Sequence, residues 1–177
     1  CALPILGRGN QAVFRVFLEY PGKTNSIPEY LLKDGLTIHR WNNDDGANVT
    51  PDYSNADLQE CLGSFIAALG KQYDGDPRIA FITAGLLGKW GEWHTYPRVE
   101  LWADKKAQAQ VLAAYEAAFH VTPILLRYPA GPEHDAQTPN ATRPFGYHDD
   151  SFAWAFSSHT SPSRESLGRA DVDPPTA

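Results

Sequence analysis

The chain has 177 residues, of which 42% are hydrophobic and 12% aromatic, and its formal net charge at pH 7 is -6. This length and apolar content suit one domain with a core of its own. Lysine and arginine never cluster, so we expect no nucleic-acid partner. No apolar run approaches the roughly 20 residues that a spanning helix needs, so we expect no membrane partner.

The first part of the chain predicts two strands separated by a short helix. Val13 to Tyr20 alternates and is rich in β-branched and aromatic residues, as strands are. Ile27 to Lys33 is expected to form a short helix that ends at Gly35, because glycine is favoured just after a helix. Leu36 to Trp41 is expected to be the second strand, and the polar segment from Asn42 to Asn55 a loop.

A long helix and a buried strand are expected next. Ser54 or Asn55 can cap the start of the helix, and Gly70 lies at its end. Arg78 to Ala84 is a nearly continuous apolar run, which suits a strand buried on both faces. The apolar residues of the helix fall at helical spacing and predict one stripe, formed by Leu58, Leu62, Phe65, Ile66 and Leu69.

The second half of the chain continues the alternation of helix and strand. Asp104 to His120 predicts a second long helix, Pro123 to Tyr128 a further strand, and Pro144 to Trp154 contains a fifth strand. Ser157 to Ala177 is rich in serine, proline and charge without periodicity, so we expect a loop or disordered tail. The apolar side of the second helix is predicted to consist of Val111, Leu112, Tyr115, Ala118 and Phe119.

This alternation predicts an α/β fold with a parallel sheet, which is either a doubly wound open sheet or a barrel. No G-x-G-x-x-G motif or P-loop follows any strand, so a nucleotide-binding open sheet has no support. A complete (β/α)8 TIM barrel typically needs about 250 residues. We therefore expect residues 1–156 to form an incomplete β/α-barrel portion and residues 157–177 to form the tail.

Several features favour a secreted, extracellular protein. The chain begins at Cys1 and contains no methionine, so we expect it to be processed, truncated or only part of the protein. Sequons at Asn48 and Asn140 permit N-glycans, although Pro51 directly after the first sequon makes Asn48 a poor acceptor. Cys1 and Cys61 either form one disulfide or leave Cys61 as a buried thiol.

The segment from Gly85 to Pro97 carries the candidate chemistry. It begins where the preceding strand is expected to end, and active sites of parallel β/α folds lie at the carboxyl ends of strands. Trp90, Trp93 and Tyr96 surround one carboxylate, Glu92, and indole rings match the apolar faces of sugars. Such surroundings favour a protonated carboxyl, so Glu92 is the predicted general acid. The alternative is a core layer in which Glu92 only bonds backbone.

These residues resemble two groups of known proteins. The pattern Gly-Leu-x-Gly-x-x-Gly-Glu before an aromatic-Pro pair is similar to the acid-bearing strand end of β-amylases, where Tyr-Pro follows one residue sooner. The closer resemblance is to a poorly characterised family of secreted, glycosidase-like (β/α)8-barrel proteins of fungi and bacteria. It rests on Trp90 to His94, Tyr73 to Arg78 and His148 to Phe152, and it covers most of the chain. The resemblance implies a barrel but supplies no substrate.

A glycosidase normally needs a second carboxylate. Asp149 and Asp150, near the end of the last predicted strand, are the first candidates. Neighbouring strand residues point to opposite faces, so only one of the two is expected to face the site. Glu19, at the end of the first strand, is the third candidate. The alternative for the Asp pair is loop capping or a salt bridge with Arg127 or Arg143.

Four other polar side chains are candidate substrate ligands. Arg40 and Arg127 close predicted strands, and they either bind the sugar or orient the catalytic carboxylates. His94 and His148 lie within the motifs and are also expected to contact substrate. The two histidines and Asp149 match no compact metal motif, so we expect no metal and no cofactor.

The first functional hypothesis is a secreted glycoside hydrolase that acts on a polysaccharide or oligosaccharide. Glu92 would be its general acid, and Asp149 or Asp150 the second carboxylate. The alternative is a non-catalytic barrel that binds carbohydrate through Trp90 and Trp93. A third reading is a metal-dependent hydrolase, whose activity would not depend on Glu92.

Overall fold

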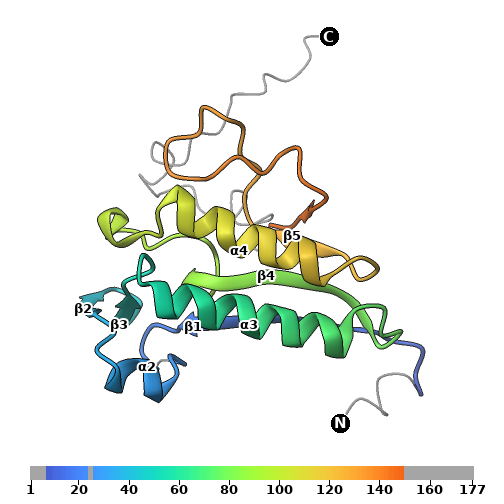
Figure 1. Cartoon of the computed structure of the whole chain (residues 1–177), viewed down its shortest axis with the longest axis horizontal. Coiled ribbons are helices and arrows are strands. Elements are labelled where there is room, and N and C mark those ends of the chain that lie inside the picture. Colours follow the sequence, from blue (N-terminus) through green and yellow to red (C-terminus); the bar gives the residue numbers. More distant parts are fainter. Residues whose placement is uncertain (1–6, 24–25, 150–177) are drawn as a thin grey trace.

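The computed structural model describes residues 7–23 and 26–149. These residues contain a parallel sheet of four strands in the order β1-β4-β5-β6 (Figure 1). The strands are β1 (Ala12–Glu19), β4 (Ile79–Lys89), β5 (Ile124–Leu126) and β6 (Gly146–Tyr147). The prediction of an α/β fold with a parallel sheet is confirmed, and the described residues form no closed barrel.

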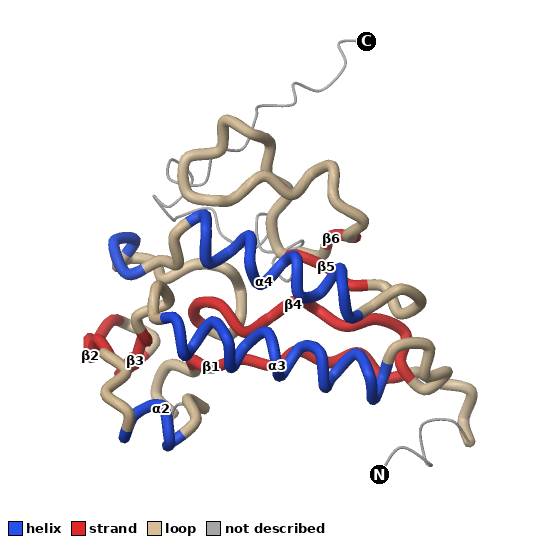
Figure 2. Tube along the Cα trace, viewed as in Figure 1, coloured by secondary structure: helices blue, strands red, loops and turns tan. Residues whose placement is uncertain are grey.

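Two long helices, α3 (Ala56–Tyr73) and α4 (Lys105–Ala118), lie side by side over the sheet (Figures 1 and 2). The chain passes from β1 through α3 to β4, and then through α4 to β5. Asn55 and Asp104 cap the two helices by accepting hydrogen bonds from main-chain N–H groups of the first turn. The strands of the sheet therefore follow one another in chain order, and both helices cover the same face.

The core lies between these helices and the sheet. The alternation along β1 separates its two faces, because Phe14 and Val16 pack against the core whereas Val13 is 49% exposed. Phe65 falls at the edge of the predicted α3 stripe and is 38% exposed, so its placement in the core is wrong. The buried core residues include Leu58, Leu62, Ile66 and Leu69 of α3, Val111, Leu112 and Tyr115 of α4, and Leu18, Ile82, Ala84, Ile124 and Leu126 of the sheet.

The two helices meet at Gly70. A Cβ atom at this position would lie 2.3 Å from the Ala118 carbonyl oxygen and 2.8 Å from the Ala118 Cβ. Both distances are well below van der Waals contact, so the missing side chain allows the helix backbones to approach. Gly63, in the same helix, has no atom within 4 Å of such a Cβ.

We expect Gly70→Ala to lower the free energy of unfolding by about 1–3 kcal/mol, because the methyl group overpacks the helix contact. Gly63→Ala is the matched control and is expected to raise it by up to about 1 kcal/mol through helix propensity alone. Urea denaturation of both variants measures the difference. Equal stabilisation by the two substitutions would show that the helices do not meet at Gly70.

A separate antiparallel hairpin follows the first strand. β2 (Ile38–Asn43) pairs with β3 (Gly46–Pro51), so the prediction of Leu36 to Trp41 as a strand of the parallel sheet is wrong, as is the loop from Asn42 to Asn55. The chain reverses within two residues and then passes through Gly46, whose φ of 112° favours glycine. The hairpin strands are largely polar, and polar strands lack the apolar alternation that reveals pairing in a sequence.

The other predicted elements are found with different ends. α2 (Glu29–Lys33) and α4 agree with prediction to within a few residues, and a 3-10 turn, η1 (Val99–Leu101), precedes α4. β4 continues to Lys89 because it keeps pairing with β1, so the segment predicted to follow the strand begins inside it. Residues 150–156 of the predicted barrel portion and the tail 157–177 lie outside the described residues.

Cys61 is a free thiol and is half-buried in α3. Its sulfur accepts a hydrogen bond from the Tyr30 hydroxyl at 3.0 Å. Cys1, its possible disulfide partner, lies outside the described residues.

The structure gives no support for N-glycans at Asn48 and Asn140, because both side chains are buried. Asn48 Nδ2 donates to Asn43 Oδ1 at 2.9 Å and to the Gly46 carbonyl at 2.8 Å. Asn140 Nδ2 donates to the Tyr128 carbonyl at 3.1 Å. At both sites the amide nitrogen that would carry a glycan is hydrogen-bonded inside the fold, so the two sequons no longer support the prediction of a secreted protein.

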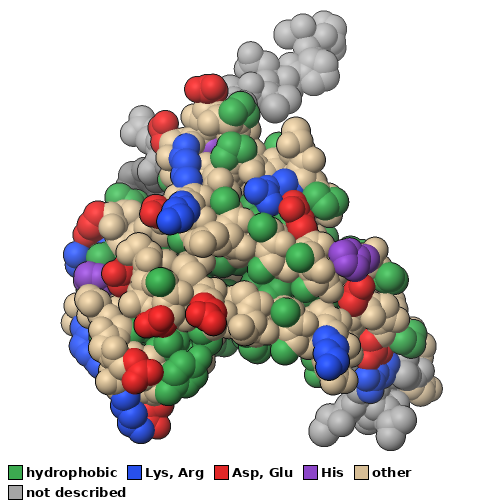
Figure 3. Space-filling view, in the orientation of Figure 1, with side chains coloured by type: hydrophobic (Ala, Val, Ile, Leu, Met, Phe, Trp, Pro, Cys, Tyr) green, Lys and Arg blue, Asp and Glu red, His purple; other side chains and the backbone are tan. Residues whose placement is uncertain are grey.

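On the face that carries the two helices, acidic and basic side chains are interspersed (Figure 3). Within the part of the chain that the structure describes, no helix combines the length and apolarity needed to cross a membrane.

Candidate active site

Glu92 lies in a tight turn immediately after β4. The turn closes on itself, since the N–H groups of Glu92 and Trp93 donate to the carbonyls of Lys89 and Leu87. Gly88 is required here, because it has a φ of 76° and a Cβ atom on it would lie 2.4 Å from the His94 carbonyl oxygen. The turn therefore holds Glu92 at the carboxyl end of a strand, as predicted.

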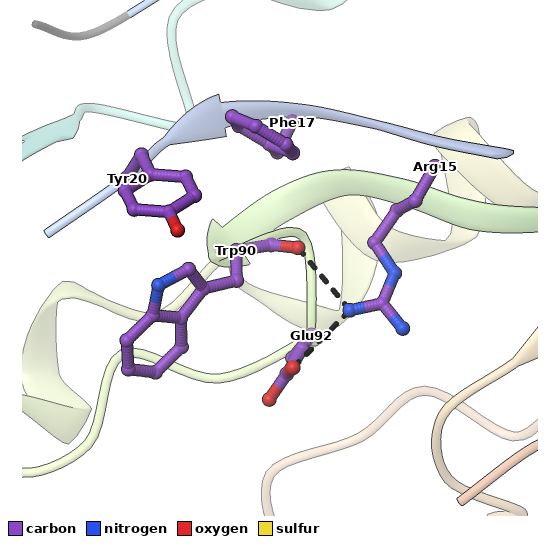
Figure 4. Close-up of a pocket in the computed structure, with 5 residues that line it drawn as sticks. All are labelled: Arg15, Phe17, Tyr20, Trp90 and Glu92. Carbon is purple, nitrogen blue, oxygen red and sulfur yellow. Dashed lines mark hydrogen bonds and ion pairs between the residues drawn. The ribbon is translucent and has the colours of Figure 1, made fainter. Parts of the chain in front are cut away.

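A hollow of about 480 Å³ lies beside this turn and is lined by Arg15, Phe17, Tyr20, Trp90 and Glu92. Figure 4 shows that the first two side chains come from β1 and that Trp90 and Glu92 come from the turn after β4. Three of the five are aromatic and can stack on the apolar face of a ligand. The hollow thus combines an aromatic lining with one carboxylate and one guanidinium.

Arg15 is a partner of Glu92 that was not among the predicted site residues. Its Nη1 lies 3.1 Å from Glu92 Oε1, and the same atom donates to the Trp90 carbonyl at 3.4 Å. Its Nε donates to Thr83 Oγ1 at 3.2 Å, which fixes the guanidinium against β4. An available signal was the position of Arg15, the one charged residue among the apolar residues from Val13 to Leu18.

His94 also reaches the carboxylate. Its Nε2 lies 3.6 Å from Glu92 Oε2, and its ring makes an edge contact with Trp90. Glu92 is therefore flanked by Arg15 on one oxygen and by His94 on the other. Both of these partners are polar, whereas the sequence predicted aromatic neighbours alone.

The structure separates the aromatic residues of the motif into two groups. Trp90 lines the hollow, whereas Trp93 is only 2% exposed, packs against Trp102 and donates from Nε1 to the Ala84 carbonyl at 2.5 Å. The prediction that Trp93 binds substrate is wrong, because its ring belongs to the core. Tyr96 is 57% exposed but does not line the hollow.

Arg40 does not belong to this site. It lies on β2 of the hairpin, where it is exposed, while its neighbour Trp41 is buried. Successive strand side chains point to opposite faces, so Arg40 points away from the side on which Trp41 packs. The strand that Arg40 was expected to close is not in the parallel sheet, so substrate binding by Arg40 loses this basis and stays a prediction.

Glu19 ends β1 but is buried and does not line the hollow. Its carboxyl accepts hydrogen bonds from Thr50 Oγ1 at 2.6 Å and from the Tyr53 hydroxyl, which in turn accepts from the Gly88 N–H at 2.7 Å. Burial raises the pKa of Glu19 from 4.5 to about 7, although these two hydrogen bonds and the charge of Lys89 lower it in part. Glu19 therefore cannot contact substrate or act as the second carboxylate in the structure as described, because its side chain is not accessible.

Asp149 follows β6 and forms a salt bridge with Arg127 Nη1 at 2.5 Å, which is one of the two alternatives open for the Asp pair. Asp149 and Glu92 both lie close enough to Tyr128 for their charges to act on its hydroxyl group. Burial raises the pKa of Tyr128, Arg127 lowers it, and the charges of Glu92 and Asp149 both add to the rise. Asp150 lies outside the described residues.

His148 is half-buried beside Asp149, and its main-chain N–H donates to the Leu126 carbonyl at 3.0 Å. The other arginine considered for Asp149, Arg143, instead pairs with Glu116 at 3.1 Å. Among residues 7–23 and 26–149, no three His, Cys, Asp or Glu side chains are grouped so as to hold a metal ion.

No protein-family model matches this chain, and a comparison with curated proteins finds no significant match. The resemblance to secreted glycosidase-like barrel proteins therefore stays a prediction.

Proposed function

We propose that this chain carries the active site of a secreted glycoside hydrolase, with Glu92 as its acid–base residue and Asp149 as the second carboxylate. The observation that carries the proposal is a carboxylate set in an aromatic hollow at the carboxyl end of a parallel strand. The aromatic rings would bind the apolar face of a sugar, and Glu92 would then lie against the glycosidic bond.

Arg15 and His94 would each have a different role at the Glu92 carboxylate. Arg15, whose Nη1 lies 3.1 Å from Glu92 Oε1, would hold the carboxylate in position while it accepts a proton from water. Protonation of the leaving oxygen needs the acid form, and His94, at 3.6 Å, is placed to exchange a proton with Glu92. Arg127 would hold Asp149 in position through their salt bridge.

We also propose that the sheet is one wall of a (β/α)8 barrel. In such a barrel, parallel strands follow one another in chain order and the helices cover one face of the sheet, as they do here. In doubly wound sheets, helices cover both faces. The face away from the helices carries apolar side chains, including Val13, Phe17 and Phe81, as the inner face of a barrel does. A crystal structure of the full-length natural protein with three or more further strands would support this proposal. An open sheet covered on both faces would contradict it.

The second candidate is a non-catalytic carbohydrate-binding protein. The specific observation in its favour is the ion pair with Arg15, because a carboxylate held by a guanidinium can serve structure alone. Trp90 would remain its main sugar contact, without Trp93.

Hydrolysis and binding measured together distinguish the two functions. Reducing-sugar release and binding are measured on a broad polysaccharide panel for the natural protein and for Glu92→Gln. Hydrolysis by the natural protein that the variant lacks supports the enzyme. Binding of the same glycan by both, with hydrolysis by neither, supports the binding protein.

A further inference from the structure

Lys89 is the last residue of β4 and is buried, with an exposed fraction of 2%. A buried ammonium group is costly unless it is paired and hydrogen-bonded. Its Nζ lies 2.5 Å from Asp45 Oδ2 in the hairpin turn and 3.2 Å from the Tyr96 carbonyl oxygen. Lys89 therefore joins the hairpin to the segment that follows Glu92.

The same ammonium group lies against two indole rings. Nζ is 4.6 Å from the centre of the Trp90 ring and 5.7 Å from that of Trp41. A cation within about 6 Å of an aromatic ring is attracted to the ring face, and the attraction is strongest for tryptophan and in buried positions. Lys89 thus has a favourable contact with a ring that lines the hollow.

The backbone of Trp90 is already held by β1. Its N–H donates to the Glu19 carbonyl at 3.0 Å, and its carbonyl accepts from Arg15. These bonds fix the left-handed backbone, with a φ of 53°, but leave the indole free to rotate about its side-chain bonds. The ring therefore needs a side-chain contact to keep one orientation, and Lys89 and His94 provide it.

We propose that Lys89 is a positioning residue that holds the Trp90 indole in place as a wall of the ligand-binding hollow. The identification of the ligand as a sugar rests on the proposed function, whereas the restraint on the ring does not. Lys89 does not touch the ligand itself, since it is buried and does not line the hollow.

The test follows the Trp90 ring directly by fluorine NMR. The chain has five tryptophans, so incorporation of 5-fluorotryptophan gives a small set of signals, and Trp90→Phe assigns the one from Trp90. Lys89→Met keeps the length of the side chain but removes its charge. We expect it to move the Trp90 signal toward that of a solvent-exposed tryptophan and to leave in place the signals of buried Trp93 and half-buried Trp102.

Asp45→Asn is the matched control. It removes the ion pair of Lys89 but leaves the ammonium group beside Trp90, so we expect the Trp90 signal to stay. An unchanged Trp90 signal in Lys89→Met, or an equal change in Asp45→Asn, would overturn the proposal.

Ligand affinity gives the second readout. For a polysaccharide that the natural protein binds, we expect Lys89→Met to weaken binding about 5- to 10-fold, the effect of losing one ring restraint. Unchanged affinity in Lys89→Met would show that ligand binding does not depend on the position of the Trp90 ring, and would overturn that part of the proposal. If the natural protein binds no polysaccharide, the proposed function fails, and the fluorine signal alone decides the positioning.

If Lys89→Met does not fold, the contact between Lys89 and Trp90 is tested in the wild-type protein instead. The ε-methylene protons of Lys89 are expected to be shifted upfield by the indole ring currents. Trp90→Leu, a change at a partly exposed residue, should remove much of that shift. An equal shift in the wild type and in Trp90→Leu would show that the two side chains do not pack together and would overturn the proposal.

Discussion

Replacing Glu92 with glutamine is expected to lower glycan hydrolysis by about 100-fold or more while binding of the same glycan is retained. Glutamine keeps the shape of the side chain and can still accept a hydrogen bond from Arg15, but it cannot exchange a proton. Loss of the acid–base group slows proton transfer in the transition state and leaves the aromatic hollow intact. Initial rates of reducing-sugar release, with binding measured separately, check the expectation.

Glu100→Gln is the matched control for this substitution. Glu100 lies on the same connecting segment as Glu92, pairs with Arg98 and has a side chain that is 57% exposed, so its replacement should leave the rate unchanged. A variant at Glu92 that is folded and as active as the natural protein would contradict the catalytic role. A variant that loses binding and hydrolysis equally would assign Glu92 to ligand binding instead.

The free energy of unfolding is expected to fall by about 3 kcal/mol as the pH rises from below 4.5 to above 7, because of Glu19 alone. Burial raises the pKa of Glu19 to about 7, so between these pH values the folded protein holds a proton that the unfolded chain has lost. The stabilisation is complete below pH 4.5 and disappears as the pH passes 7. Urea denaturation at several pH values across this range measures how steeply the free energy of unfolding falls as the pH rises.

Glu19→Gln is expected to remove this decrease in the free energy of unfolding with rising pH, since glutamine is neutral at every pH. Glu29→Gln is the control, because Glu29 is exposed and its ion pair with Lys33 lies on the surface of α2. Its curve should run parallel to that of the natural protein. Parallel curves for the natural protein and Glu19→Gln would mean that Glu19 titrates as it does in the unfolded chain.

The position of Glu92 could be predicted from its sequence neighbours, but its chemical surroundings could not. Glycines and aromatic residues after an apolar run indicate a turn at a strand end, and the structure places Glu92 in such a turn. Arg15 is 77 residues away in the sequence and meets Glu92 only because β1 and β4 pair in parallel. Trp90 and Trp93 look equivalent in the motif, and only the path of the turn puts one ring in the hollow and the other in the core.

The sequence by itself determined the alternation of strands and long helices, because the periods of apolar residues report directly on which face of each element is buried. It therefore led to a parallel sheet with α3 and α4 and to a carboxylate at a strand end. The tertiary structure alone decided that the polar segment after β1 is a hairpin, that Asn48 and Asn140 are buried, and that Arg15, Lys89 and Glu19 surround the turn. The hairpin is local, but its polar strands lack the apolar alternation that reveals pairing. The contacts of Arg15 with Glu92 and of Lys89 with Asp45 join residues distant in the chain, and a local pattern carries no record of them.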